Sequence, residues 1–172
     1  MVRNRYIAGT HGPQIAAAVA VAATIAVSIT CATAAVAEPA VPGYRVTLLP
    51  TMRACNFQQV DYAIGRASAR PRAEITTAGG VVVAHIDMTD GASNTRYVVR
   101  LIPTPHPVLG CLAGDPSITT GTLLTGDTGT GGATLQASVR SGTDGVWLAV
   151  DLPALHSQTP EEFYSSSYVA AV

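Results

Sequence analysis

The sequence is 172 residues long and nearly balanced in charge, with ten basic against eleven acidic side chains. All of the basic side chains are arginine, and nowhere do they gather into the positive patch that a nucleic-acid interface needs. The composition therefore excludes a nucleic-acid-binding protein. The length suits a single domain with one hydrophobic core.

An export signal is predicted in residues 1–37. Two arginines precede an apolar run over residues 15–27, which is followed by Ala-Val-Ala at residues 35–37. A charged start, an apolar middle and small residues at the cleavage site form a secretory signal peptide. We therefore expect a single secreted β domain, residues 38–172, with no membrane attachment after cleavage. The alternative is an uncleaved anchor, since residues 15–37 are long enough to span a bilayer.

Two cysteines, Cys55 and Cys111, remain in the predicted mature domain, because Cys31 lies within the signal peptide. An even number of cysteines in an oxidising compartment predicts a disulfide. The bond closes a loop of about 56 residues, and the entropy removed from the unfolded chain then stabilises the fold by about 4 kcal/mol. This contribution is comparable with the whole net stability of a small domain.

The predicted domain consists of short β-type segments separated by turn residues. Breaks at residues 78–80, 90–91, 126–132 and 141–145 contain the glycines that tight turns require. The predicted strands cover residues 44–49, 72–77, 81–87, 95–102, 121–125, 133–139 and 146–152, with an eighth near 164–169. Seven or eight short strands at this spacing indicate an antiparallel sandwich or barrel.

Two segments carry helical signals. In residues 56–67, three apolar side chains recur at roughly helical spacing behind Asn56, which can cap a helix. A short helix after Cys55 therefore competes with a β interpretation of that segment. Residues 159–162 (Thr-Pro-Glu-Glu) have the form of a capping box and predict at most one helical turn.

One stretch resembles a known group of proteins. A strand at residues 95–102 (TRYVVRLI), then Cys111, then a strand, glycine-rich hairpin and strand over residues 121–139 are similar to the second half of small secreted immunoglobulin-like sandwich proteins of high-GC bacteria. The resemblance implies an all-β, antiparallel immunoglobulin-like sandwich, and it implies no particular chemistry. Trp147 follows both cysteines instead of lying between them, so the antibody-type spacing does not predict that it packs on the disulfide.

The histidines of the predicted domain are His85, His106 and His156, and His85 shares a strand face with Asp87. With a loop histidine, these two residues are candidates for a metal site or for the catalytic groups of a small hydrolase. A competing interpretation is that the following turn folds Asp87 against Arg96 as an ordinary cross-strand ion pair. No nucleotide-binding or nucleophile motif occurs, and no cofactor is expected.

His106 stands between Pro105 and Pro107 in a long connection that contains Cys111 and continues to Pro116. Rigid loops on a sandwich are common recognition sites, so this segment is a candidate binding loop. The alternative is a purely structural crossover between the two sheets.

The absence of nucleotide-binding and nucleophile motifs, together with the predicted disulfide across a β scaffold, leads to one functional hypothesis. We expect a secreted or envelope-associated, non-enzymatic binding or structural module, with an extracellular or envelope partner. Its predicted core comprises Val82, Ala84, Ile86, Tyr97, Val99, Leu101, Leu123, Leu135, Trp147 and Val150.

Overall fold

The computed structural model describes residues 43–61 and 68–172, and the regular structure in that part of the chain is antiparallel β-strand. The all-β prediction is confirmed. The predicted signal peptide, residues 1–37, lies outside the described residues. The strands are β1 (Tyr44–Leu49), β2 (Arg70–Ala78), β3 (Val81–Thr89), β4 (Arg96–Thr104), β5 (Thr119–Thr125), β6 (Gly131–Ser138), β7 (Gly145–Leu152), β8 (Glu162–Ser166) and β9 (Ala170–Ala171).

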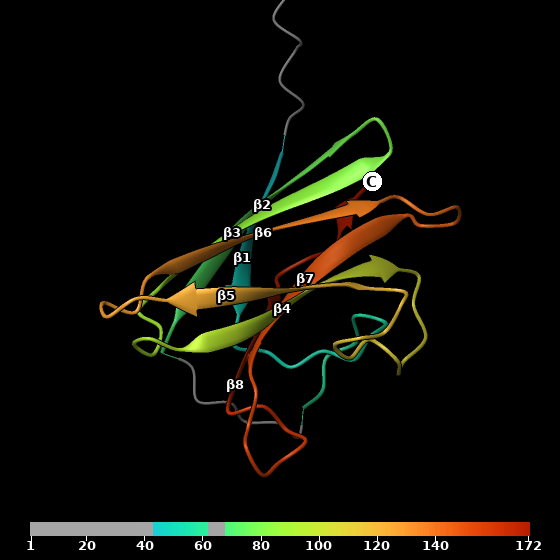
Figure 1. The fold of residues 1–172 in the computed structure, drawn as a ribbon. Helices are drawn as coiled ribbons and strands as arrows, with labels where there is room; N and C mark the ends of the chain where they lie inside the picture. Colours follow the sequence, from blue (N-terminus) through green and yellow to red (C-terminus); the bar gives the residue numbers. More distant parts are fainter. Residues whose placement is uncertain (1–42, 62–67) are drawn as a thin grey trace, which may run out of the picture. The chain divides into compact units, whose positions relative to one another are not determined.

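The strands close into a barrel instead of forming two separate sheets. They follow the order β4-β5-β6-β3-β2-β1-β8-β7, and β4 pairs with β7 to complete the ring (Figure 1). The predicted antiparallel pairing is confirmed, whereas the single closed sheet differs from the two separate sheets of the predicted sandwich. β4 pairs with β5 along one edge and with β7 along the other, and the pairing with β7 closes the ring. A closed ring has no unpaired edge strand between its members.

Two of the seams between strands are short. β1 meets β8, and β5 meets β6, at only two residue pairs each. Longer ladders join β6-β3-β2-β1 on one side and β5-β4-β7-β8 on the other. The barrel therefore consists of two four-stranded halves that touch along two narrow seams.

Side chains alternate between the barrel interior and its outer surface, as the strand pattern predicts. All ten residues predicted for the core are buried. β7 and β8 are exceptions to the alternation, because consecutive residues in both strands are buried. Leu148 and Val150 join the barrel core, whereas Trp147 and Ala149 belong to a separate cluster on the outer side of the strand. Loops must therefore cover the outer face of β7.

The structure has no helix among the described residues, so the described part of the predicted helix is wrong. Residues 52–60 fold back on themselves, and the Val60 N–H donates to the Met52 carbonyl over 2.9 Å. Phe57 takes a positive φ of 70°, which a helix does not allow. The remainder of that predicted helix lies outside the described residues. The predicted helical turn near the end is also wrong, because β8 begins at Glu162 and pairs there with β7.

A polar network lies at Glu162. Tyr164 and Tyr97 both donate to Glu162 Oε2, over 2.7 and 3.3 Å. Each phenol oxygen also accepts a backbone N–H over 3.0 Å, from Ala69 for Tyr164 and from Ala92 for Tyr97. Burial is the main cause that raises the pKa of both phenols above the ordinary tyrosine value of 10.0, and the Glu162 carboxylate adds to it.

The raised pKa values of these two tyrosines predict that the folded protein loses stability at alkaline pH. The folded protein retains their protons where the unfolded chain releases them, so their contribution is complete below about pH 10 and is lost as the pH rises further. Urea unfolding at increasing pH should show a steeper alkaline loss in the wild type than in Tyr164→Phe. The exposed control Tyr44→Phe should keep the wild-type slope. Equal slopes in all three proteins would contradict this prediction.

Candidate functional site

Two loops are tied together over the outer face of the barrel. Residues 50–61 follow β1, and residues 105–118 connect β4 to β5. Cys55 and Cys111 join the two loops in a disulfide with Cα atoms 5.6 Å apart, which confirms the predicted bond. The Cys55 N–H also donates to the Val108 carbonyl over 3.1 Å. A covalent bond and a backbone hydrogen bond therefore fix the loops to each other.

Trp147 lies beneath the disulfide. Its outward-facing side chain is buried in one cluster with both cysteines, and the Phe57 ring meets it edge-on at 5.5 Å between centroids. The spacing of the cysteines did not predict this packing, which arises because both loops cover β7. The indole Nε1 has no hydrogen-bond partner among the described residues. A buried N–H without an acceptor costs free energy, so this atom is an unsatisfied donor in the wall of the site.

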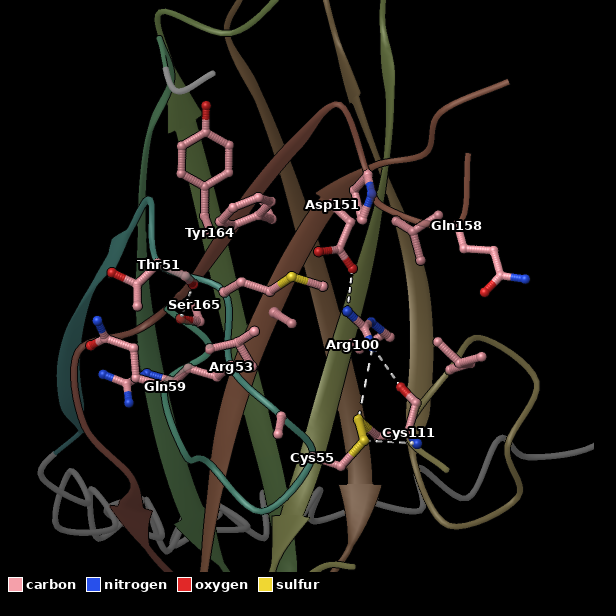
Figure 2. Close-up of a pocket in the computed structure, with 18 of the residues that line it drawn as sticks. Thr51, Arg53, Cys55, Gln59, Arg100, Cys111, Asp151, Gln158, Tyr164 and Ser165 are labelled. Carbon is pink, nitrogen blue, oxygen red and sulfur yellow. Dashed lines mark hydrogen bonds and ion pairs between the residues drawn. A yellow bond between two sulfur atoms is a disulfide. The ribbon is translucent and has the colours of Figure 1, made fainter. Parts of the chain in front are cut away.

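A buried ion pair lies on the same outer face. Arg100 of β4 and Asp151 of β7 have side chains that are each 13% exposed, and Arg100 Nη2 donates to Asp151 Oδ2. Arg100 Nη1 donates to the Cys111 carbonyl over 2.6 Å, so the guanidinium joins the two strands to the disulfide loop (Figure 2). Burial raises the pKa of Asp151, and the adjacent guanidinium counteracts that rise.

The sequence analysis did not single out Arg100 or Asp151. The available signal was a charged residue flanked by apolar ones in each of two strands, Arg100 in VVRLI and Asp151 in VWLAVDL. A charge that interrupts an apolar run is placed on a buried face only when a partner neutralises it. The pairing of β4 with β7, which the sequence does not reveal, makes these two charges partners.

These elements enclose a pocket of about 870 Å³. Its walls come from the loops at residues 50–61 and 105–118, the segment at residues 153–160, and the outer faces of β4, β7 and β8 (Figure 2). Apolar side chains among those that line it include Met52, Val98, Val108, Leu112, Trp147 and Phe163. The pocket has the volume of a small-molecule site, for which the usual range is roughly 300–1,000 Å³.

The rim of the pocket carries apolar side chains that face solvent. Leu109 is 80% exposed and Leu112 is 74% exposed, and Val108 beside them is also exposed. Exposed large apolar groups that border an apolar cavity are typical of a surface that a ligand covers. The candidate site is therefore this pocket together with its rim.

His85 and Asp87 lie on the outer face of β3, away from this pocket. His85 Nδ1 is 2.9 Å from Thr134 Oγ1 of β6. The predicted Asp87–Arg96 ion pair is wrong, because β3 pairs with β2 and β6 and not with β4. Across the described ranges, no three His, Cys, Asp or Glu residues come close enough together to hold a metal ion, so neither these two residues nor the loop histidines His106 and His156 belong to such a group.

His106 contacts Ser117 within the candidate binding loop. Its Nε2 is 3.0 Å from Ser117 Oγ, and its Nδ1 is 2.9 Å from the Pro107 carbonyl. Ser117 donates both its backbone N–H and its hydroxyl to Asp115, which hold the pKa of that carboxyl below its usual range. Because the hydroxyl proton of Ser117 is directed to Asp115, His106 is not placed as its base.

The loop that contains His106, Pro105 and Pro107 is a local connection. It joins β4 to β5, which are neighbours in the barrel, so it is not a crossover between two sheets. Pro105 and Pro107 are exposed, whereas His106 is half-buried. The part of the loop that lines the large pocket comes later, from Val108 to Ala113.

None of the family models, curated proteins or solved structures compared with this chain matches it. Within residues 43–61 and 68–172, no helix is long and apolar enough to cross a membrane. What the pocket binds is therefore inferred from the pocket itself.

Proposed function

We propose that this protein is a secreted or envelope-associated binding module, without catalysis, that takes a small and largely apolar ligand into the loop-covered pocket. The observation that carries the proposal is the pocket of about 870 Å³ with its exposed apolar rim at Leu109 and Leu112. Ligand sites are concave and mostly apolar, with a few polar groups that fix orientation, and Arg100 and Asp151 are such groups.

The disulfide supports an extracytoplasmic location. Structural disulfides persist in oxidising compartments and are rare in the cytosol. Cys55–Cys111 holds two walls of the pocket together, so the proposed binding function and the proposed location depend on the same bond.

The division of the barrel into two halves supports the proposed relation to immunoglobulin-like proteins. β6-β3-β2-β1 lie on one side and β5-β4-β7-β8 on the other, and the chain passes between sides after β3, β5 and β6. Repeated crossing between two antiparallel faces is the connectivity of such sandwiches. We propose that this chain is a version of that architecture whose edges have closed.

Dodecanol is a suitable probe of the pocket, because Trp147 is the only tryptophan and lies in its wall. We expect dodecanol, added below its solubility limit in water, to change the Trp147 fluorescence in a saturable way. Leu112→Asp should weaken binding by about tenfold or more, because a leucine buried by the ligand contributes about 1.5–3 kcal/mol.

The matched control is Leu124→Asp. Leu124 is a leucine that is 60% exposed on β5 and does not line the pocket, so this variant should bind as the wild type does. Equal weakening in both variants would show that dodecanol adheres to exposed apolar surface in general. No saturable change in the wild type would overturn the proposed function.

A further inference from the structure

We infer that the ligand of this pocket carries an acidic head group, a carboxylate on an apolar body, which the guanidinium of Arg53 holds. This inference rests on the proposed function of the same pocket and adds the chemical class of the ligand. It follows from the hydrogen bonds and charges of Arg53 and of the residues around it.

Arg53 lies in the wall of the pocket with part of its hydrogen-bonding capacity unused. Its Nη1 donates to the Phe57 carbonyl over 2.9 Å, and its guanidinium carbon lies 3.9 Å from the centroid of the Phe57 ring. Its Nε is buried and has no acceptor among the described residues. Burial lowers the pKa of Arg53, which means that the charged form has lost hydration.

The other charges of the pocket do not neutralise Arg53. Arg100 and Asp151 neutralise each other, and Figure 2 shows Arg53 beside Gln59, on the side away from Asp151. Asp61 is exposed and accepts a hydrogen bond from Gln59 Nε2 over 3.0 Å. Within the described ranges, Arg53 takes part in no ion pair. The cation is therefore partly desolvated by the protein without a bound anion.

The unsatisfied buried atoms of the pocket are both donors. Besides Arg53 Nε, the indole Nε1 of Trp147 is buried without a partner among the described residues, and both residues line the pocket. Phe57 contacts both residues: the guanidinium carbon of Arg53 lies 3.9 Å from its ring centroid, and its ring meets the indole of Trp147 edge-on at 5.5 Å between centroids. Among the described residues, this wall of the pocket therefore has more unsatisfied buried hydrogen-bond donors than acceptors, which favours a ligand with acceptor oxygens over one with donors.

A carboxylate is the acceptor that this wall fits best. The planar guanidinium presents paired N–H donors that match the two carboxylate oxygens, and charge-assisted bonds of this kind are about twice as strong as neutral ones. The apolar lining and the exposed rim require the rest of the ligand to be hydrocarbon. A long-chain carboxylate combines both properties.

Three probes that share a dodecyl tail and differ in the head group separate the contributions of head group and tail to the affinity. We expect Trp147 fluorescence to report tighter binding of dodecanoate than of dodecanol by about tenfold, because a hydrogen bond to a charged group contributes about 1.5–3 kcal/mol. Dodecyltrimethylammonium should bind more weakly than dodecanol. In Arg53→Gln the ratio of the dodecanoate affinity to the dodecanol affinity should fall to about one, because this ratio isolates the contribution of the charged contact.

Two further variants are controls. Arg53→Lys keeps the charge without the forked donors, and it should retain a reduced preference for dodecanoate. Arg72→Gln removes an exposed arginine of β2 that does not line the pocket, and it should leave all three affinities unchanged. Far-UV circular dichroism and thermal unfolding establish that each variant is folded.

The outcomes distinguish the two proposals. If dodecanol binds and dodecanoate binds no more tightly, or if the cationic probe binds best, the acidic head group is overturned and the binding function stands. A preference for dodecanoate that persists in Arg53→Gln overturns the role of Arg53. If none of the three probes binds, the proposed function itself fails.

Discussion

Replacing Cys55 and Cys111 together by serine is expected to lower the free energy of unfolding by about 4 kcal/mol. The disulfide joins residues that are 56 positions apart, so its loss frees a long loop in the unfolded chain. It also releases the two loops that cover Trp147 and Ala149, which lie in the same buried cluster as the cysteines. Urea unfolding followed by Trp147 fluorescence measures the change.

Reduction of the wild-type protein is the matched control. The reduced wild type and the double serine variant should unfold at the same urea concentration and should both lose affinity for dodecanol. A loss of less than about 1 kcal/mol would contradict the prediction, because it falls well below the typical contribution of a disulfide, about 2–4 kcal/mol.

Breaking the ion pair between Arg100 and Asp151 is the second change with a large expected effect. Asp151→Leu leaves the guanidinium of Arg100 buried without its carboxylate, and this should cost about 3–5 kcal/mol. The double variant Arg100→Met/Asp151→Leu removes both charges and should recover most of that loss. A double-mutant cycle in urea measures the coupling. Additive costs in the double variant would contradict a coupled pair.

The free energy of unfolding of Arg100→Met, the variant that removes the other partner of the ion pair, should depend on pH. Burial raises the pKa of Asp151, and removal of Arg100 takes away the charge that counteracts the rise. A carboxyl with a raised pKa in the folded state stabilises the fold fully below its unfolded value, about 4, and this contribution is lost as the pH rises through the folded value. The deficit of Arg100→Met relative to the wild type should therefore be larger at neutral pH than near pH 4. A deficit that does not change with pH would show that the Asp151 carboxylate is not buried.

Strand positions and core residues could be predicted from the sequence because their signals are local. The predicted first strand, residues 44–49, coincides with β1, and the next six overlap their counterparts closely, whereas the eighth, near 164–169, shares only residues 164–166 with β8. Alternation of apolar and polar side chains marks the inner face, and glycine-containing breaks mark the turns. The disulfide was predictable because the predicted mature domain, residues 38–172, contains only two cysteines.

Strand partners could not be predicted from the same signals. The Asp90-Gly91 turn looks like that of a hairpin, yet β3 and β4 are not neighbours, because β3 pairs with β6 from much later in the chain. Alternation of apolar and polar residues determines which face of a strand is buried, but it does not determine which strand pairs with each edge. The pattern therefore does not distinguish a sandwich from a closed barrel. The helical spacing after Asn56 failed for a related reason, because the disulfide and the packing of Phe57 on Trp147 determine that segment.

The pocket could be recognised only once the loops were placed. Arg53, Arg100 and Asp151 come from three separate segments, and each is unremarkable in its own stretch of sequence. One signal was present in residues 145–152, GVWLAVDL, where a nearly continuous apolar run indicates a strand that is buried on both faces. Such a strand requires other segments to pack on its outer face, and here these segments are the loops that form the walls of the pocket.

Proton NMR of the folded protein with bound dodecanol tests most directly whether an apolar ligand lies against Trp147. Intermolecular nuclear Overhauser effects are expected from the dodecyl chain to the Trp147 indole and to the methyl groups of Val108 and Leu112, which share the pocket wall. Saturable binding with contacts only to residues elsewhere, such as the exposed Leu124 of β5, would contradict the account.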